Sequence, residues 1–89
     1  MIRMFVRHTV NDYNAWRKVY DAFADEQENA GVRSEAVYQS VDNPNDVTVL
    51  HDFADIDAAR AFVDSAMLRE AMTSAGVQGQ PQVWFTNES

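Results

Sequence analysis

Two kinds of side chain alternate along the first ten residues. One side of an extended chain would carry an apolar set with one histidine: Ile2, Met4, Val6, His8 and Val10. The other side would carry Arg3, Arg7 and Phe5. This alternation predicts a strand over residues 2–10 whose first face is buried.

After Val10 the apolar spacing changes from two to three and four, which is typical of a helix with one buried face. The stripe consists of Tyr13, Trp16, Val19, Tyr20 and Phe23. It predicts a helix that Asn11 or Asp12 caps and that ends near Ala30, before Gly31. A second helical region follows Asp55 and ends at Gly76, and Ser65 is expected to divide it into two pieces.

Three further strands complete the pattern. Residues 32–41 and 47–53 are joined by a turn rich in Asp, Asn and Pro, and a last strand covers Val83–Phe85. We expect Tyr38 to point inward from the second strand, and His51 and Phe53 from the third. The order βαββαβ predicts one domain over residues 1–89.

The opposite face of these strands mixes large apolar and charged residues: Phe5, Val37, Leu50 and Trp84 with Arg3, Arg7, Arg33, Glu35 and Asp52. A monomer would leave this mixture in water. Its apolar members favour a second sheet packed against it in a homodimer, and its opposite charges could pair across that interface.

The two strand-to-helix junctions repeat one another. His8 and His51 each precede a capping aspartate by four residues, and an alanine and an arginine recur at matching offsets (Arg17 and Arg60). The repeat predicts a split βαβ arrangement in which residues 2–10 and 47–53 lie side by side and parallel. His8 and His51 would then lie at the same level on neighbouring strands.

Composition narrows the class of protein. The 89 residues include no cysteine, so neither a disulfide nor a cysteine-based zinc site is available. The net charge of -7 and seven scattered basic residues argue against nucleic acid as a partner. No apolar run is long enough to span a membrane and the N-terminal residues lack the core of a signal peptide, so a cytoplasmic location is the default expectation.

His8 and His51 are the candidate catalytic residues, because a neutral imidazole can take up a proton near neutral pH. The alternative is that each is a core histidine whose ring nitrogens are satisfied by backbone, water or a hydroxyl group. No metal site is predicted, since two histidines need a third ligand and Asp52 alternates to the other face. The candidate substrate-binding residues, which could equally be core, are Trp16, Tyr20, Tyr38, Phe53, Phe62, Met67 and Met72.

The chain resembles the dimeric α/β-barrel superfamily of ferredoxin-like proteins, in particular its antibiotic-biosynthesis monooxygenase-like and cyclase group. The resemblance rests on the strand that ends in His8, on Asp12–Trp16, on Asp55–Phe62, and on Ala75–Val77 with Pro81. It implies an α+β fold, a four-stranded antiparallel sheet, a dimeric barrel, and a ligand cavity between sheet and helices.

Members of this group include cofactor-independent oxygenases of aromatic polyketides and quinols, cyclases, lactone isomerases and proteins without known activity. The haem-degrading relatives use a helical histidine, whereas both histidines here lie in predicted strands, which argues against haem degradation. The resemblance therefore implies a small enzyme without a cofactor that acts on an aromatic or polyketide-like molecule, as a monooxygenase or a cyclase/isomerase. The alternative is a non-catalytic dimeric barrel that binds a hydrophobic small molecule or has a structural role.

Overall fold

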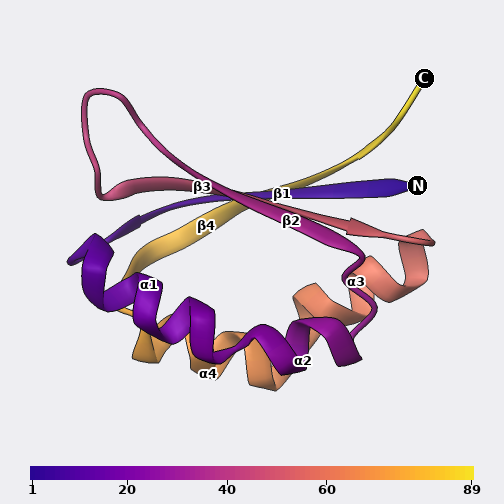
Figure 1. Ribbon diagram of the computed structural model, residues 1–89, viewed down its shortest axis with the longest axis horizontal. Coiled ribbons are helices and arrows are strands. Elements are labelled where there is room, and N and C mark those ends of the chain that lie inside the picture. Colours follow the sequence, from indigo (N-terminus) through magenta and orange to yellow (C-terminus); the bar gives the residue numbers. More distant parts are fainter.

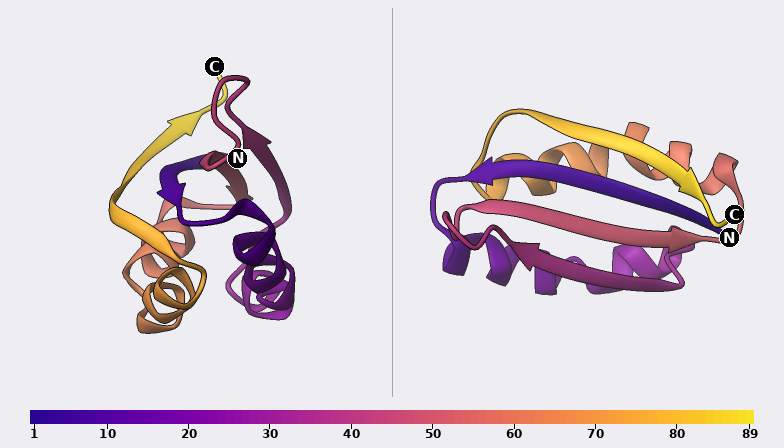
Figure 2. Two further views of the ribbon diagram at one scale, coloured as in Figure 1. Left: turned by 90° about the vertical axis from the view of Figure 1, so that its left-hand side faces the viewer. Right: turned by 90° about the horizontal axis from the view of Figure 1, so that it is seen from above.

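The computed structural model describes residues 1–89 and consists of one sheet with helices under one of its faces (Figure 1). The strands are β1 (Ile2–Val10), β2 (Ser34–Gln39), β3 (Asp46–Phe53) and β4 (Val77–Asn87). The helices are α1 (Tyr13–Ala22), α2 (Ala24–Asn29), α3 (Ile56–Asp64) and α4 (Ala66–Ser74). The end-on view in Figure 2 shows that no helix covers the outer face of the sheet. None of the helices combines the length and the apolar character needed to cross a bilayer.

The strand order is β2-β3-β1-β4, and every neighbouring pair is antiparallel. This confirms the predicted α+β, ferredoxin-like fold with its four-stranded antiparallel sheet. The prediction of a parallel pair from the repeat is wrong. The chain returns through α1 and α2 to place β2 parallel to β1, and the β2–β3 turn then reverses it, so that β3, inserted between them, runs antiparallel to both.

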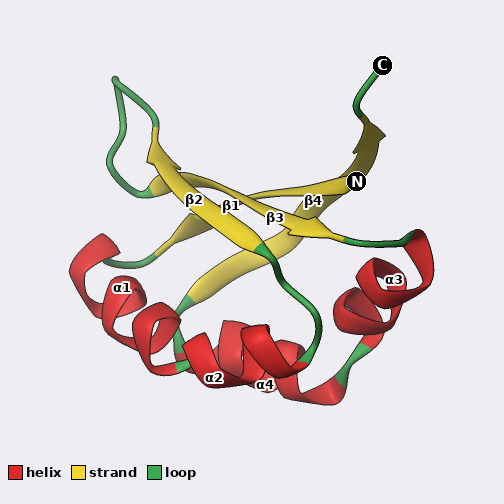
Figure 3. Ribbon diagram, turned by 45° about the vertical axis from the view of Figure 1, so that its right-hand side comes forward, coloured by secondary structure: helices red, strands yellow, loops and turns green.

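The predicted helix starts are confirmed by hydrogen bonds. The Asp12 carboxylate accepts from the backbone N–H of Ala15, and Asp55 accepts from that of Ala58. Ser65 divides the second helical region as expected, and its hydroxyl oxygen accepts from the Leu68 N–H at the start of α4. Figure 3 shows the separate helical segments below the sheet and the β2–β3 turn, which projects away from them.

The first helical region and the last strand differ most from the prediction. The first helical region is broken at Phe23, whose N–H is shared between the carbonyls of Val19 and Tyr20 as the helix tightens. The last strand is longer than predicted and runs through Gly79 and Pro81. β4 lies at a sheet edge, where a proline need not cost a ladder hydrogen bond, and its register with β1 shifts between Arg7 and Thr9.

The predicted faces of β2 are reversed. Tyr38 pairs with Thr48 on the outer face, whereas Glu35 pairs with His51 and Val37 with Val49 on the face under the helices. Both alternating sets of β2 contain one large apolar residue, so hydrophobicity alone does not orient this edge strand. Its pairing with β3 does, and a one-residue change of phase moves every side chain to the opposite face.

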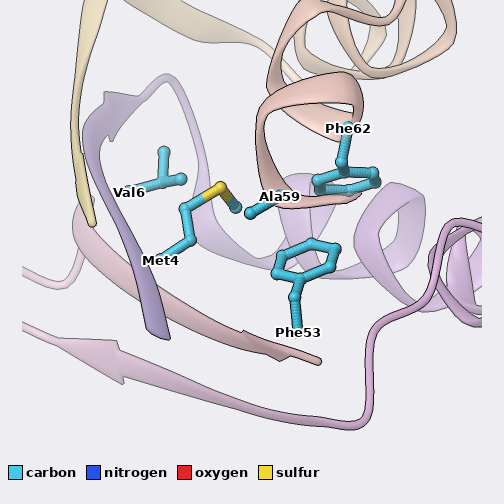
Figure 4. Close-up of a cluster of buried hydrophobic side chains, with 5 residues drawn as sticks. All are labelled: Met4, Val6, Phe53, Ala59 and Phe62. Atoms are coloured by element: carbon cyan, nitrogen blue, oxygen red, sulfur yellow. The ribbon is translucent and has the colours of Figure 1, made fainter. Parts of the chain in front are cut away.

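The core lies between the sheet and the helices in two clusters. One consists of Met4, Val6, Phe53, Ala59 and Phe62, where the ring of Phe53 lies beside that of Phe62 (Figure 4). The other consists of Val10, Trp16, Val47, Val49 and Ala75. Both clusters contain residues of β1 and β3, the two central strands.

The outer face carries charge pairs within the chain. The Arg3 guanidinium donates to Asp52 through two nitrogens, at 2.8 and 3.0 Å, and Ser34 Oγ donates to the same carboxylate. Arg7 is paired with Asp46 in the same way. Arg3, Arg7 and Asp52 therefore already have partners on neighbouring strands of the same chain.

Replacement of Phe53 tests the position of the core. Phe53 is fully buried between Met4 and Phe62, so Phe53→Ala should lower the free energy of unfolding by about 3–5 kcal/mol through lost burial and a residual cavity. The matched control is Val41→Ala in the exposed β2–β3 turn, which should change stability by less than about 0.5 kcal/mol. Urea unfolding would measure both, and an equal effect of the two substitutions would contradict this core.

Candidate functional site

A small cavity lies between the sheet and the helices. Its volume is about 50 Å³ and its wall is mostly apolar. Six of the predicted site residues line it: His8, Trp16, Tyr20, His51, Phe62 and Met72. They come from β1, β3, α1, α3 and α4, so the fold brings together side chains from most of its length.

Three predicted site residues lie outside the cavity wall. Tyr38 is exposed on the outer face of the sheet, because the phase of β2 is the reverse of the predicted one. Phe53 points under the helices as expected, but it is packed into the core. Met67 lies on the exposed side of α4, where 56% of its surface is accessible, because Leu68 and Met72, one helical turn apart, take the side that faces the cavity.

Aromatic rings form a continuous row along the cavity. The ring of His8 lies 5.7 Å from that of Trp16, which stacks on Tyr20 with centroids 4.9 Å apart. Tyr20 lies nearly parallel to the His51 ring at 6.1 Å, and His51 meets the Phe62 ring edge-on at 5.5 Å. Trp16 and Tyr20 are one helical turn apart on α1, so their rings bridge the space between the two imidazoles.

The expected close approach of His8 and His51 is wrong. In the antiparallel register His8 lies opposite Val47, while His51 lies opposite Met4. The two positions are therefore four residues apart along the strands, roughly 13 Å at the usual rise per residue. Both histidines face the same cavity, but they stand toward opposite ends of the aromatic row.

The buried imidazoles are incompletely hydrogen-bonded. Neither ring nitrogen of His8 has a partner within the protein, and the same is true of His51 Nδ1. Both side chains are more than nine-tenths buried. A buried polar atom without a partner costs about 1–3 kcal/mol, and native structures contain few of them. Three such atoms around one small cavity distinguish this site from an ordinary apolar core.

The remaining nitrogen of His51 belongs to a short polar chain. Tyr20 Oη lies 3.1 Å from His51 Nε2 and donates to Glu35 Oε2 at 2.9 Å. Sequence reasoning missed Glu35, because the reversed phase of β2 assigned it to the outer face. It also missed Gln27, a buried polar residue of the cavity wall, although Gln27 continues the helical spacing of Tyr20 and Phe23.

Burial controls the protonation of these groups. It lowers the pKa of His51 from 6.5 to about 4, against the carboxylates of Glu35 and Asp52, which raise it. Burial likewise lowers the pKa of His8, with Asp46 acting in the opposite direction. Burial and the contact with Glu35 raise the pKa of Tyr20, outweighing Gln27 and Arg17. At neutral pH the cavity therefore contains two neutral imidazoles and a protonated phenol.

This arrangement suits proton transfer with a small hydrophobic molecule. A neutral imidazole in an apolar wall can accept a proton, and the rings provide flat surfaces for an aromatic ligand. No group of three or more His, Asp or Glu side chains is placed to share a metal ion. Carboxylates lie near both histidines but outside the apolar wall.

Comparison with solved structures identifies the architecture. The chain matches no protein-family model and no curated protein. A Bordetella bronchiseptica protein assigned as an antibiotic biosynthesis monooxygenase superposes with a TM-score of 0.85 and 18% identity, over 99% of this chain and 96% of that one. SnoaB, a cofactor-independent oxygenase from Streptomyces nogalater, gives 0.81 and 15%, over 99% and 92%. A conserved protein from Methanosarcina mazei Go1 gives 0.78 and 17%, also over 99% and 92%.

The chain has the same ferredoxin-like fold as these solved structures. The predicted resemblance is thus confirmed in its architecture, over nearly the full length of both chains compared. At these identities the shared fold does not carry a reaction with it, because one fold supports many chemistries. The function of this chain has to be inferred from the cavity.

The buried histidines predict a pH dependence of stability. Because the pKa of His51 is lowered on folding, the unfolded chain takes up its proton first as the pH falls. The effect of His51 on the free energy of unfolding should be absent above about pH 6.5. Between about pH 6.5 and pH 4, protonation of the unfolded chain at His51 should lower that free energy by about 3 kcal/mol. Urea unfolding at several pH values would measure this loss.

Two comparisons make this test specific. His51→Gln should remove most of the pH dependence in that window and leave the smaller contribution of His8. Asp46 and Asp52 have pKa values below their ordinary value of 3.8, so their effect belongs to lower pH. Unfolding free energies that stay constant between pH 7 and 4 would show that His51 is not buried in neutral form.

Proposed function

We propose that this protein is a small cofactor-independent enzyme that acts on an aromatic or polyketide-like molecule in the cavity between sheet and helices. The observation that carries the proposal is the set of unpartnered nitrogens on His8 and His51 in an apolar, aromatic-lined cavity. A bound hydroxyl or activated C–H group would supply what these nitrogens lack. The SnoaB structure, described as a cofactor-independent oxygenase, supports the same general kind of chemistry on this fold.

The first step is removal of a proton from the substrate by His8 or His51. Trp16 and Tyr20 would hold the flat part of the molecule, and Phe62 and Met72 would complete the wall. Since the two imidazoles stand toward opposite ends of the row, only one of them acts on a given atom, and the other can bind a second polar group. This favours an elongated substrate with oxygen atoms at both ends.

The resulting anion has two possible fates. It can cyclise or isomerise, in which case the proton returns from the imidazolium to another atom of the product. It can instead donate electrons to molecular oxygen. For a ring methylene group, one oxygen atom then forms the new carbonyl and the other leaves as water with the two hydrogens, so a four-electron oxidation of carbon balances the reduction of O₂. Neither course needs a group other than the imidazole base and, for oxidation, O₂.

The size of the cavity requires movement before a ring can enter. Its volume of about 50 Å³ compares with ~150 Å³ for a protein cavity that binds benzene. Val6, Leu68 and Met72 line both this cavity and a groove of about 350 Å³ between α4 and β4. α4 contains no fully buried residue, so its side chains can move more easily than those of the core. The cavity and the groove would join if Leu68 and Met72 were displaced.

The same small volume favours the alternative function. A non-catalytic barrel would either bind a hydrophobic small molecule without converting it or fold around two structural histidines with the cavity closed. The burial of both imidazoles is compatible with that reading. Enzyme and binding protein differ in whether a bound aromatic molecule is converted.

Turnover tests the enzyme. Dihydroxynaphthalene and anthrone would be incubated with the purified protein without added flavin or metal, while oxygen uptake and product mass are followed. If His51 is the base, His51→Gln should lower kcat by about 100-fold or more. Met72→Trp should block the route from the groove and raise KM. The matched control is Met67→Trp on the exposed side of α4, which should leave both constants unchanged.

Each outcome assigns a function. Binding of these compounds by calorimetry without conversion would support the binding protein. Conversion that survives both His51→Gln and His8→Gln would contradict a histidine base. Absence of both binding and conversion across the panel would argue against an aromatic substrate of this kind.

The outer face of the sheet is the proposed dimer surface. Phe5 stacks on Trp84 with ring centroids 5.3 Å apart, and Trp84 and Tyr38 retain 42% and 55% of their exposure. No helix covers this face (Figure 2). A second copy of the sheet would cover these rings and close the barrel, as the resemblance implies.

A charge placed on this face tests the dimer. Trp84→Glu should give monomers or aggregates in sedimentation velocity, because it would bury an unpaired carboxylate between two sheets. Val41→Glu adds the same charge in the exposed turn and should leave the assembly unchanged. A wild-type protein that sediments as a monomer at micromolar concentration would rule out the proposed homodimer.

A further inference from the structure

Glu35, Tyr20 and His51 form a chain from the protein surface to the cavity. Glu35 lies on the edge strand β2, directly opposite His51 on β3, and its side chain is exposed. Tyr20 reaches both from α1, at 2.9 Å from Glu35 Oε2 and 3.1 Å from His51 Nε2. The phenol and imidazole rings are nearly parallel, with 8° between their planes. Three separate elements are thus linked, and Glu35 reaches Nε2 of His51 only through Tyr20.

The number of protons in this chain determines the tautomer of His51. The phenol has one proton and two possible acceptors, a carboxylate oxygen and an imidazole nitrogen. A hydrogen bond to the charged carboxylate is the stronger of the two, and the phenol is oriented to donate to Glu35. The phenol oxygen can then only accept from His51, so Nε2 must carry the hydrogen. A neutral imidazole has one N–H, and the lone pair is therefore on Nδ1.

We infer that Glu35 is a positioning residue that acts through Tyr20 to hold His51 in its Nε2–H tautomer, which leaves Nδ1 as the proton-accepting atom in the cavity. Nδ1 is buried and has no hydrogen-bond partner within the protein. When Nδ1 takes a proton, the Nε2–H remains on Tyr20 and the Glu35 carboxylate stabilises the imidazolium. A base oriented by a second group, itself held by a carboxylate, is an arrangement that increases basicity at a defined atom.

This inference rests on the proposed function for its catalytic meaning, and it selects His51 rather than His8. His8 has no partner on either nitrogen, so nothing in the protein determines its tautomer. The position of the hydrogen on His51 can nevertheless be measured without any substrate. The two proposals can therefore fail separately.

The experiment is ¹⁵N-detected NMR of the histidine rings at pH 7, where the two nitrogens of a neutral imidazole have distinct shifts. Wild-type His51 should show a protonated Nε2 and an unprotonated Nδ1. In Glu35→Ala the phenol loses its carboxylate acceptor and should donate to Nε2, so the hydrogen moves to Nδ1. Glu35 is exposed, and its replacement should leave the fold intact.

Asp52→Asn is the matched control. Asp52 also raises the pKa of His51 by its charge, but it lies on the outer face and has no contact with Tyr20. This variant should keep the Nε2–H tautomer, which separates the hydrogen bond from the effect of charge. Tyr20→Phe should abolish the preference that Glu35 imposes and give the same His51 spectrum whether or not Glu35 is present.

The outcomes are distinct. A wild-type His51 with the hydrogen on Nδ1, or a tautomer that Glu35→Ala does not change, would overturn the inference and leave His8 as the candidate base. The expected tautomers in a protein that converts no aromatic substrate would support the inference and count against the proposed enzyme. Where a substrate is converted, Glu35→Ala should lower kcat about 100-fold with little change in KM, and Asp52→Asn should not.

Discussion

β1 and β3 lie antiparallel at the centre of the sheet, with Met4 opposite His51 and Val47 opposite His8. The face that these two strands turn toward the helices contributes residues to both core clusters and one wall of the cavity. Because side chains alternate strictly along a strand, a shift of either strand by one residue would turn its histidine to the outer face. The register of this one pair therefore positions the imidazoles, and α1 then adds Trp16 and Tyr20 between them.

Two imidazoles inside a domain of this size are an energetic cost. Small domains bury a modest fraction of their surface, so their free energy of unfolding is small. The unpartnered nitrogens of His8 and His51 lower it by an amount that matters at this size. Surrounding apolar packing has to offset that cost, and Phe53, Met4 and the valines of β1 and β3 provide it. A departure from good hydrogen bonding that is held in place by a well-packed core is typical of functional sites.

The polar chain from Glu35 gives the two histidines different roles. His51 contacts Tyr20 and lies near two carboxylates, whereas His8 has a ring contact with Trp16 and feels the charge of Asp46. The outer face of the sheet also contains two kinds of residue, paired charges and apolar rings. The charge pairs of Arg3 with Asp52 and Arg7 with Asp46 are complete within one chain, whereas the stacked rings of Phe5 and Trp84 lie on the face of the sheet that no helix covers.

Local patterns in the sequence were sufficient for much of this structure. The alternation in residues 2–10, the helical spacing from Tyr13 to Phe23 and the caps Asp12, Asp55 and Ser65 all involve neighbours within a few residues, and the structure confirms the elements they predict. The same patterns placed His8, His51, Trp16 and Tyr20 on the buried side. The direction of β3, the face of β2 and the separation of the histidines depend on which strands pair and in what register. Those features are set by contacts between distant residues, such as His51 with Met4 and Glu35, and only the tertiary structure decided them.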